Sequence, residues 1–127
     1  MTGDVAATDP AVDGPDDADA LLERAREERA AFDPPADPDD RALSYLREGL
    51  WPVLERYIEV RSNGDRLSRA EHDALERALN GWLELYARCY GVEIEAEFAV
   101  REAAELFVDT HNVRDTAQLL THVPARR

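Results

Sequence analysis

Four side chains near the C-terminus have the chemistry of transition-metal ligands: Asp109, His111, Asp115 and His122. His111 and Asp115 are four residues apart and could meet across the start of a helix, whereas His122 lies beyond its end. A transition metal needs three or four convergent ligands, and this spacing matches no established pattern. We therefore predict capping and surface roles for these residues, with no metal and no cofactor.

A nucleophile is also not indicated. Cys89 would be nucleophilic only if an electropositive neighbour lowered its pKa. It instead falls on the helical stripe of Trp82, Tyr86 and Tyr90, which predicts a buried, inert thiol. The 28 acidic side chains are too many for any pair to be specific, and no serine elbow or glycine-rich phosphate loop is present. The sequence predicts no catalytic residue and no enzyme.

Three arginines cluster in the stretch "RSNGDRLSR": Arg61, Arg66 and Arg69. Their planar guanidinium groups could recognise a carboxylate or a phosphate. Because Asp65 lies among them and Glu71 follows, the stretch is also typical of a balanced, exposed turn. We retain the three arginines as candidate partner-binding residues.

The segment from Asp39 to Asn63 predicts one helix, with Asp39 or Asp40 as its cap. Apolar residues recur in it at steps of three and four, from Leu43 through Leu46, Leu50, Val53, Leu54 and Tyr57 to Val60. This period continues through Pro52, so we expect one helix that is kinked around Gly49 to Pro52. Trp51, beside the kink, is a candidate exposed anchor for a partner, because aromatic residues are frequent in binding hot spots.

The next helix has the clearest start, because "SRAE" at Ser68 to Glu71 is a capping box. Its apolar stripe is broad and comprises Leu75, Leu79, Trp82, Tyr86, Cys89 and Tyr90. A helix with so narrow a polar face predicts packing on several sides. We expect it to be the centre of a bundle and to end at Gly91.

The stretch "VEIEAEFAV", Val92 to Val100, alternates as a strand does. A lone strand would have no partner to satisfy its backbone, which favours a helix from about Glu93 to Thr110. A last helix of about two turns should follow, capped by Asn112 and packed through one apolar face.

This last helix resembles the first helix and turn of the helix-turn-helix in Fis-like and bacterial enhancer-binding regulators. The resemblance covers about a tenth of the chain and rests on Asn112, Ala117, Leu119, Leu120 and Val123. It implies a DNA-associated regulator with a second helix that reads the major groove. Thr121 stands where that motif usually has glycine, and the reading helix would have to begin near Pro124. We therefore favour a short helix that folds back over the bundle, with DNA binding as the alternative.

Most of the net charge of −13 belongs to the N-terminal segment, since residues 1–40 contain 13 acidic residues and three arginines. We expect residues 1–38 to form an acidic, largely disordered arm with one short, loosely attached helix from Asp19 to Phe32, and residues 39–124 to form a helical bundle domain. All 15 basic residues are arginine. Abundant acid with arginine and no lysine resembles the composition of proteins from salt-loving archaea.

The fold class that these patterns predict is all-α, a small bundle of about four helices with a flexible acidic N-terminal arm. One cysteine, no export signal and no apolar run of ~20 residues predict a soluble cytoplasmic protein without membrane contact. The favoured function is a small non-enzymatic protein-interaction or adapter module of a halophilic cytoplasm, whose partner is another protein. A DNA-associated regulator is the alternative, and a metal-dependent enzyme is the least favoured.

Overall fold

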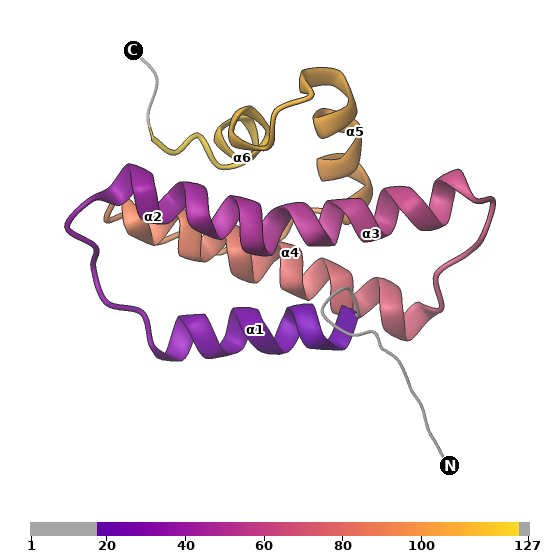
Figure 1. Cartoon of the computed structure of the whole chain (residues 1–127), viewed down its shortest axis with the longest axis horizontal. Coiled ribbons are helices and arrows are strands. Elements are labelled where there is room, and N and C mark those ends of the chain that lie inside the picture. Colours follow the sequence, from indigo (N-terminus) through magenta and orange to yellow (C-terminus); the bar gives the residue numbers. More distant parts are fainter. Residues whose placement is uncertain (1–17, 125–127) are drawn as a thin grey trace.

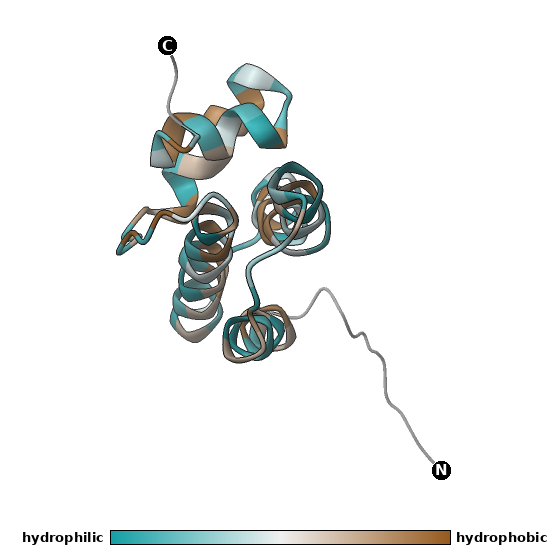
Figure 2. Cartoon of the chain, turned by 90° about the vertical axis from the view of Figure 1, so that its left-hand side faces the viewer, coloured by the Kyte–Doolittle hydropathy of each residue, from teal (hydrophilic) through white to brown (hydrophobic). Residues whose placement is uncertain are grey.

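The computed structural model describes residues 18–124, and this range is all-α with no β-strand, as predicted (Figure 1). Its α-helices are α1 (Ala18–Ala30), α2 (Pro38–Tyr45), α3 (Trp51–Ser62), α4 (Arg69–Cys89), α5 (Val100–Thr110) and α6 (Val113–Thr121). The acidic arm falls mostly on residues 1–17, which lie outside the described residues. Viewed end-on, α1, α4 and the α2–α3 helix run side by side, and α5 and α6 cover one side of them (Figure 2).

Helix α4 is the enclosed centre of the bundle, as its broad apolar stripe predicts. Trp82 and Tyr86 are 1% and 0% exposed, respectively. The side chain of Ser68 accepts a hydrogen bond from the backbone N–H of Glu71, which confirms the Ser68 half of the predicted capping box, whereas the return bond from the N–H of Ser68 to the Glu71 carboxylate is not formed. Glu71 makes its own side-chain bond to Arg56 of α3, so it links two helices.

Helices α2 and α3 form one continuous helix, joined by a π-helical turn, Leu46–Leu50. The N–H of Trp51 donates to the carbonyl of Leu46, five residues back. Because Pro52 has no N–H, one helical hydrogen bond is missing at this point in any case. The wider π-helical turn lies just before the proline. The predicted continuity is confirmed, but the cap is Asp37, whose side chain accepts from the N–H of Asp40.

The π-helical turn also brings the helix backbone against the indole ring of Trp82. A Cβ atom at Gly49 would overlap Cδ2, Cε2 and Cε3 of that ring, so only glycine permits this approach. The same ring lies 5.8 Å from that of Tyr45. The backbone at Gly49 and the centre of α4 are therefore in direct contact.

Helix α1 is part of this same core, and the expectation of a loosely attached helix is wrong. Leu21 is 0% exposed and Ala25 is 3% exposed. Ala25 lies so close to α4 that a Cβ at Gly81 would be 3.3 Å from its methyl group. Arg29 forms an ion pair with Glu84 of α4 at 2.6 Å. Because the core takes residues from both sides of residue 38, that position does not bound the packed unit.

Replacing Leu21 with alanine should destabilise the whole bundle by about 3 kcal/mol, because a fully buried leucine leaves a cavity. Urea unfolding followed by circular dichroism measures the change. Glu27→Ala, at an exposed position of the same helix, is the control and should have little effect. An equally small effect of Leu21→Ala would mean that α1 is not part of the cooperative core.

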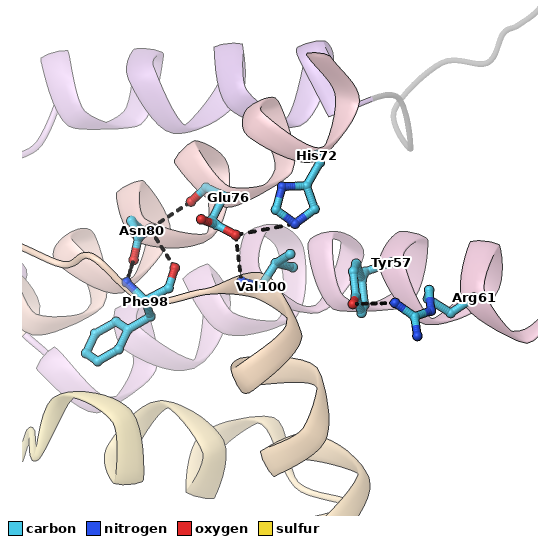
Figure 3. Close-up of polar contacts among 7 residues, drawn as sticks. All are labelled: Tyr57, Arg61, His72, Glu76, Asn80, Phe98 and Val100. Carbon is cyan, nitrogen blue, oxygen red and sulfur yellow. Dashed lines mark hydrogen bonds and ion pairs between the residues drawn. The ribbon is translucent and has the colours of Figure 1, made fainter. Parts of the chain in front are cut away.

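The segment before α5 is extended, so the predicted helix from Glu93 is wrong for its first turns. Polar side chains of α4 accept hydrogen bonds from alternate backbone N–H groups of the segment (Figure 3). These bonds run from Ala96 to Glu84, from Phe98 to Asn80 and from Val100 to Glu76, with N···O distances of 3.1, 2.8 and 3.1 Å. The amide of Asn80 also donates to the carbonyl of Phe98 at 3.1 Å. These side chains thus pair alternate N–H groups of the segment without a partner strand.

Candidate binding groove beside Trp51

Trp51 is the first residue of α3 and is half-buried. Its ring centroid lies 4.9 Å from that of Phe107 in α5, with 43° between the ring planes. The structure therefore gives the candidate anchor an aromatic neighbour on one side and leaves part of the indole accessible. Tilted aromatic pairs at this separation are favourable, so the ring is held in place.

A groove of about 470 Å³ begins at this aromatic pair. It lies between the α2–α3 helix on one side and α5 with α6 on the other. Its lining residues are Leu43, Arg47, Trp51, Phe107, His111, Asn112, Val113 and Arg114. The carbon-rich part of the lining comes from Leu43, Trp51, Phe107 and Val113, and the charged part comes from two arginines. No acidic residue is among those that line it.

The two arginines differ in their surroundings. The side chain of Arg47 is exposed and has no hydrogen bond or ion pair with any residue between 18 and 124. Arg114 forms an ion pair with Asp39 at 3.2 Å, and Asp39 also accepts a hydrogen bond from the hydroxyl of Tyr90 at 2.7 Å. One guanidinium is thus free to meet a ligand, and the other is oriented by the framework.

Tyr86 of α4 and Tyr90, which directly follows α4, hold the α6 side of the groove. Burial, followed by the hydrogen bond to Asp39, raises the pKa of Tyr90 well above its ordinary value, so its hydroxyl stays a donor. Burial raises the pKa of Tyr86 to about 12, and its hydroxyl donates to the carbonyl of Val123 at 2.5 Å. Arg114, in the first turn of α6, is therefore tied to Tyr90 through Asp39, and Val123, just beyond α6, is tied to Tyr86.

The histidines of the proposed ligand set act as helix caps. His111 and His122 have left-handed φ angles of 53° and 59°. Each N–H donates to the carbonyl four residues back, at 2.7 Å in both cases. In the part of the chain that the structure describes, no three His, Cys, Asp or Glu side chains are grouped to hold a metal ion.

Cys89 is buried, as predicted. Burial raises the pKa of its thiol to about 11, although Arg41 acts in the opposite direction. At neutral pH the sulfur is therefore a protonated thiol and a weak nucleophile.

The three predicted arginines lie away from the groove. Arg61 is ten residues beyond Trp51 on α3, which corresponds to roughly 15 Å along the helix. Arg61 and Arg66 line another hollow at that end, and Arg69 is exposed at the first residue of α4. The structure thus separates the predicted anchor from the predicted cationic cluster.

Sequence reasoning missed the basic rim of the groove. Leu43, Arg47 and Trp51 are four residues apart, so in a continuous helix they share one face. That spacing was the available signal for Arg47. Arg114 gives no such signal, because its position depends on how α6 packs.

The fold and the site define the class of protein: a small all-α domain with an apolar groove that has a basic rim. The chain belongs to the family described as "Domain of unknown function (DUF8055)", whose model matches residues 15–125 and so includes α1. None of the curated proteins and none of the solved structures matches the chain. Among residues 18–124, no helix has the length and apolar character needed to cross a membrane.

Proposed function

We propose that this protein is a non-enzymatic interaction module that binds an acidic segment of another protein in the groove beside Trp51. The observation that carries the proposal is the charge of the groove. Its lining contains two arginines and no acidic residue, although the chain has a net charge of −13. Electrostatic complementarity of this kind selects a partner by its charge.

The partner segment should combine acidic residues with at least one bulky apolar side chain. The apolar side chain would contact Trp51 and Phe107, where burial of carbon supplies affinity. The carboxylates would meet Arg47 and Arg114, which favours the correct orientation. A basic partner segment would instead be attracted to the rest of the surface.

We further propose a halophilic cytoplasm as the setting. The support is compositional: 28 acidic residues against 15 basic ones, all of them arginine. At molar salt the Debye length falls to about 3 Å, so the repulsion between an acidic partner and the acidic surface is screened. Close contacts inside the groove are affected less.

Trp51→Ala should abolish partner capture and leave the helical circular dichroism unchanged, because the indole is only half-buried. Affinity capture from a high-salt lysate, with identification by mass spectrometry, supplies the partner. Synthetic peptides from its acidic segments can then be titrated against the protein by tryptophan fluorescence. Trp82 is 1% exposed, so a change in emission on binding reports mainly on Trp51.

Two charge reversals test the role of the rim. Arg47→Glu should weaken peptide binding at least tenfold, because the free guanidinium becomes a repulsive carboxylate. Arg24→Glu, on α1 and outside the groove, makes the same change in net charge and is the matched control. Equal weakening by both variants would attribute binding to overall charge and would reject the groove.

The DNA-associated alternative has a separate outcome. Retention on DNA at reduced salt, weakened by Arg114→Glu but not by Arg24→Glu, would replace the peptide proposal. Deleting α6 is not a clean test, because its residues Ala117 and Leu120 are buried in the core and their removal would disturb the fold.

A further inference from the structure

A second cleft lies at the opposite end of α3 from Trp51. It consists of two adjoining hollows of about 540 and 500 Å³, which share Tyr57, Arg61 and Arg101 in their linings. The elements that form it are α3, the α3–α4 loop, the start of α4 and α5. Because the two hollows share these lining residues, they lie next to each other, and one ligand could occupy both.

The first hollow is cationic. Three arginines and one histidine, from four different parts of the fold, line it: Arg61, Arg66, Arg101 and His72. Asp65 is the one acidic residue of that lining. The positive charges of neighbouring arginines repel one another, so a cluster of them is costly unless acidic residues neutralise it. The chain has an excess of acidic residues, 28 against 15 basic ones, that could do so. Glu105 forms an ion pair with Arg101 and Glu76 lies 3.6 Å from His72, whereas Arg61 and Arg66 have no carboxylate partner among the described residues. Two neighbouring guanidinium groups without a carboxylate partner are the property expected of an anion site.

Two of the arginines are oriented but keep free donors. One terminal nitrogen of Arg61 donates to the hydroxyl of Tyr57 at 3.2 Å, and its guanidinium lies 5.8 Å from the centre of the tyrosine ring (Figure 3). The Nε of Arg101 donates to Glu105 at 3.1 Å, which leaves its terminal nitrogens available. The side chain of Arg66 has no partner among the described residues. Oriented guanidinium groups with unused N–H groups favour bidentate recognition of oxyanions.

The second hollow is apolar where it meets α5. Ile58, Ala104 and Val108 contribute carbon to its lining, and Val108 is 54% exposed, the largest exposure among the large apolar residues of the described chain. Glu105 and Asp109 also line this hollow. An apolar body would therefore be covered here, while a second anionic group would be repelled.

We propose that this cleft binds a small organic anion, with its phosphate or carboxylate between Arg61 and Arg101 and its apolar body against Ile58 and Val108. The site is independent of the groove beside Trp51. It places a small-molecule ligand on a domain whose other surface binds a protein segment.

Isothermal titration calorimetry at constant ionic strength and low chloride tests the proposal with four probes: inorganic phosphate, phenyl phosphate, acetate and benzoate. Each aromatic probe should bind at least tenfold more tightly than its small counterpart, because the ring covers apolar surface. The phosphate and carboxylate pairs identify which head group is preferred. Failure of all four probes to bind saturably would overturn the proposal.

Variants locate the binding. Arg61→Gln and Arg101→Gln should each weaken the preferred probe at least tenfold, because each removes charge-assisted hydrogen bonds. Val108→Asp should abolish the advantage of the aromatic probe. These positions are exposed, so thermal unfolding should confirm that each variant is folded.

Two control variants remove one arginine elsewhere. Arg24→Gln on α1 and Arg47→Gln in the groove should leave probe affinity unchanged. An equal loss in Arg24→Gln would indicate unspecific attraction, and an equal loss in Arg47→Gln would place the anion in the groove; either result overturns this assignment. Unchanged affinity in Trp51→Ala would show that the cleft binds independently of the groove.

Discussion

Gly49→Ala should destabilise the protein by about 3 kcal/mol or more, although alanine is ordinarily better than glycine in a helix by about 1 kcal/mol. The new methyl group would overlap three atoms of the Trp82 ring. That ring is 1% exposed and rests against Tyr45, so it has no free space into which to move. The steric cost therefore exceeds the gain in helix propensity, and the sign of the effect reverses.

Urea or thermal unfolding followed by circular dichroism measures this change. Gly81→Ala is the matched control, because Gly81 is also inside a helix and its new methyl group would meet only the methyl of Ala25, at 3.3 Å. Its cost should be clearly smaller. In a protein that carries Trp82→Leu, adding Gly49→Ala should cost less stability than it does in the unmodified protein, because the ring that the methyl group overlaps is gone. If Gly49→Ala proves neutral or stabilising, the close approach of the helix to Trp82 is wrong.

The parts of the fold that the sequence predicts are those with dense apolar periodicity. The stripe through Trp82 and Tyr86 predicts an enclosed helix, and both residues are buried. The unbroken period across Pro52 predicts one helix, and the π-helical turn keeps it continuous. In both cases many large side chains repeat at helical spacing, so local pattern and burial agree.

The packing of helix α1 is not evident from the sequence, because its buried face is made largely of small residues. Ala18 and Ala25 offer little apolar signal, yet small side chains are what allow α1 to approach Gly81. The acidic composition of residues 1–40 also suggested a boundary. Charge is a property of the surface, however, and a helix can be strongly acidic outside and packed inside.

The extended segment before α5 is not predicted by the backbone argument. A lone strand lacks a partner strand, but side chains can supply the missing acceptors as well as another strand can. The signal was present in α4. Glu76, Asn80 and Glu84 are spaced by four, and they therefore form a polar row along one face of α4.

The sequence indicates those residues of a candidate site that lie within one helix or one short stretch, and it does not indicate the residues that other elements contribute. The pattern of its own helix indicates Trp51, and the single stretch from residue 61 to residue 69 indicates Arg61 and Arg66. Helix α5 contributes a further lining residue to each site: Phe107 to the groove beside Trp51 and Arg101 to the cleft. Their positions depend on the direction of α5, which tertiary contacts determine rather than local pattern.

Helix α5 is positioned by the polar row of α4, and Asn80 is its central member. Asn80→Ala should destabilise the protein by about 2–3 kcal/mol, because two hydrogen bonds to Phe98 are lost and partly buried backbone groups are left without partners. Since α5 carries Phe107 and Arg101, binding in the groove beside Trp51 and in the cleft at the other end of α3 should weaken too. Arg77→Ala, at an exposed position of the same helix, should change neither.

Amide hydrogen exchange distinguishes this row from a packed loop held only by its apolar side chains. The N–H groups of Ala96, Phe98 and Val100 donate to α4, whereas those of Glu95 and Glu97 have no acceptor among the described residues. Protection should therefore alternate with a period of two along the segment, a pattern otherwise produced by pairing with a strand. In Asn80→Ala the protection of Phe98 should fall most. Uniformly fast exchange in the unmodified protein would show that the segment is not held by these side chains, and that the placement of α5 has another cause.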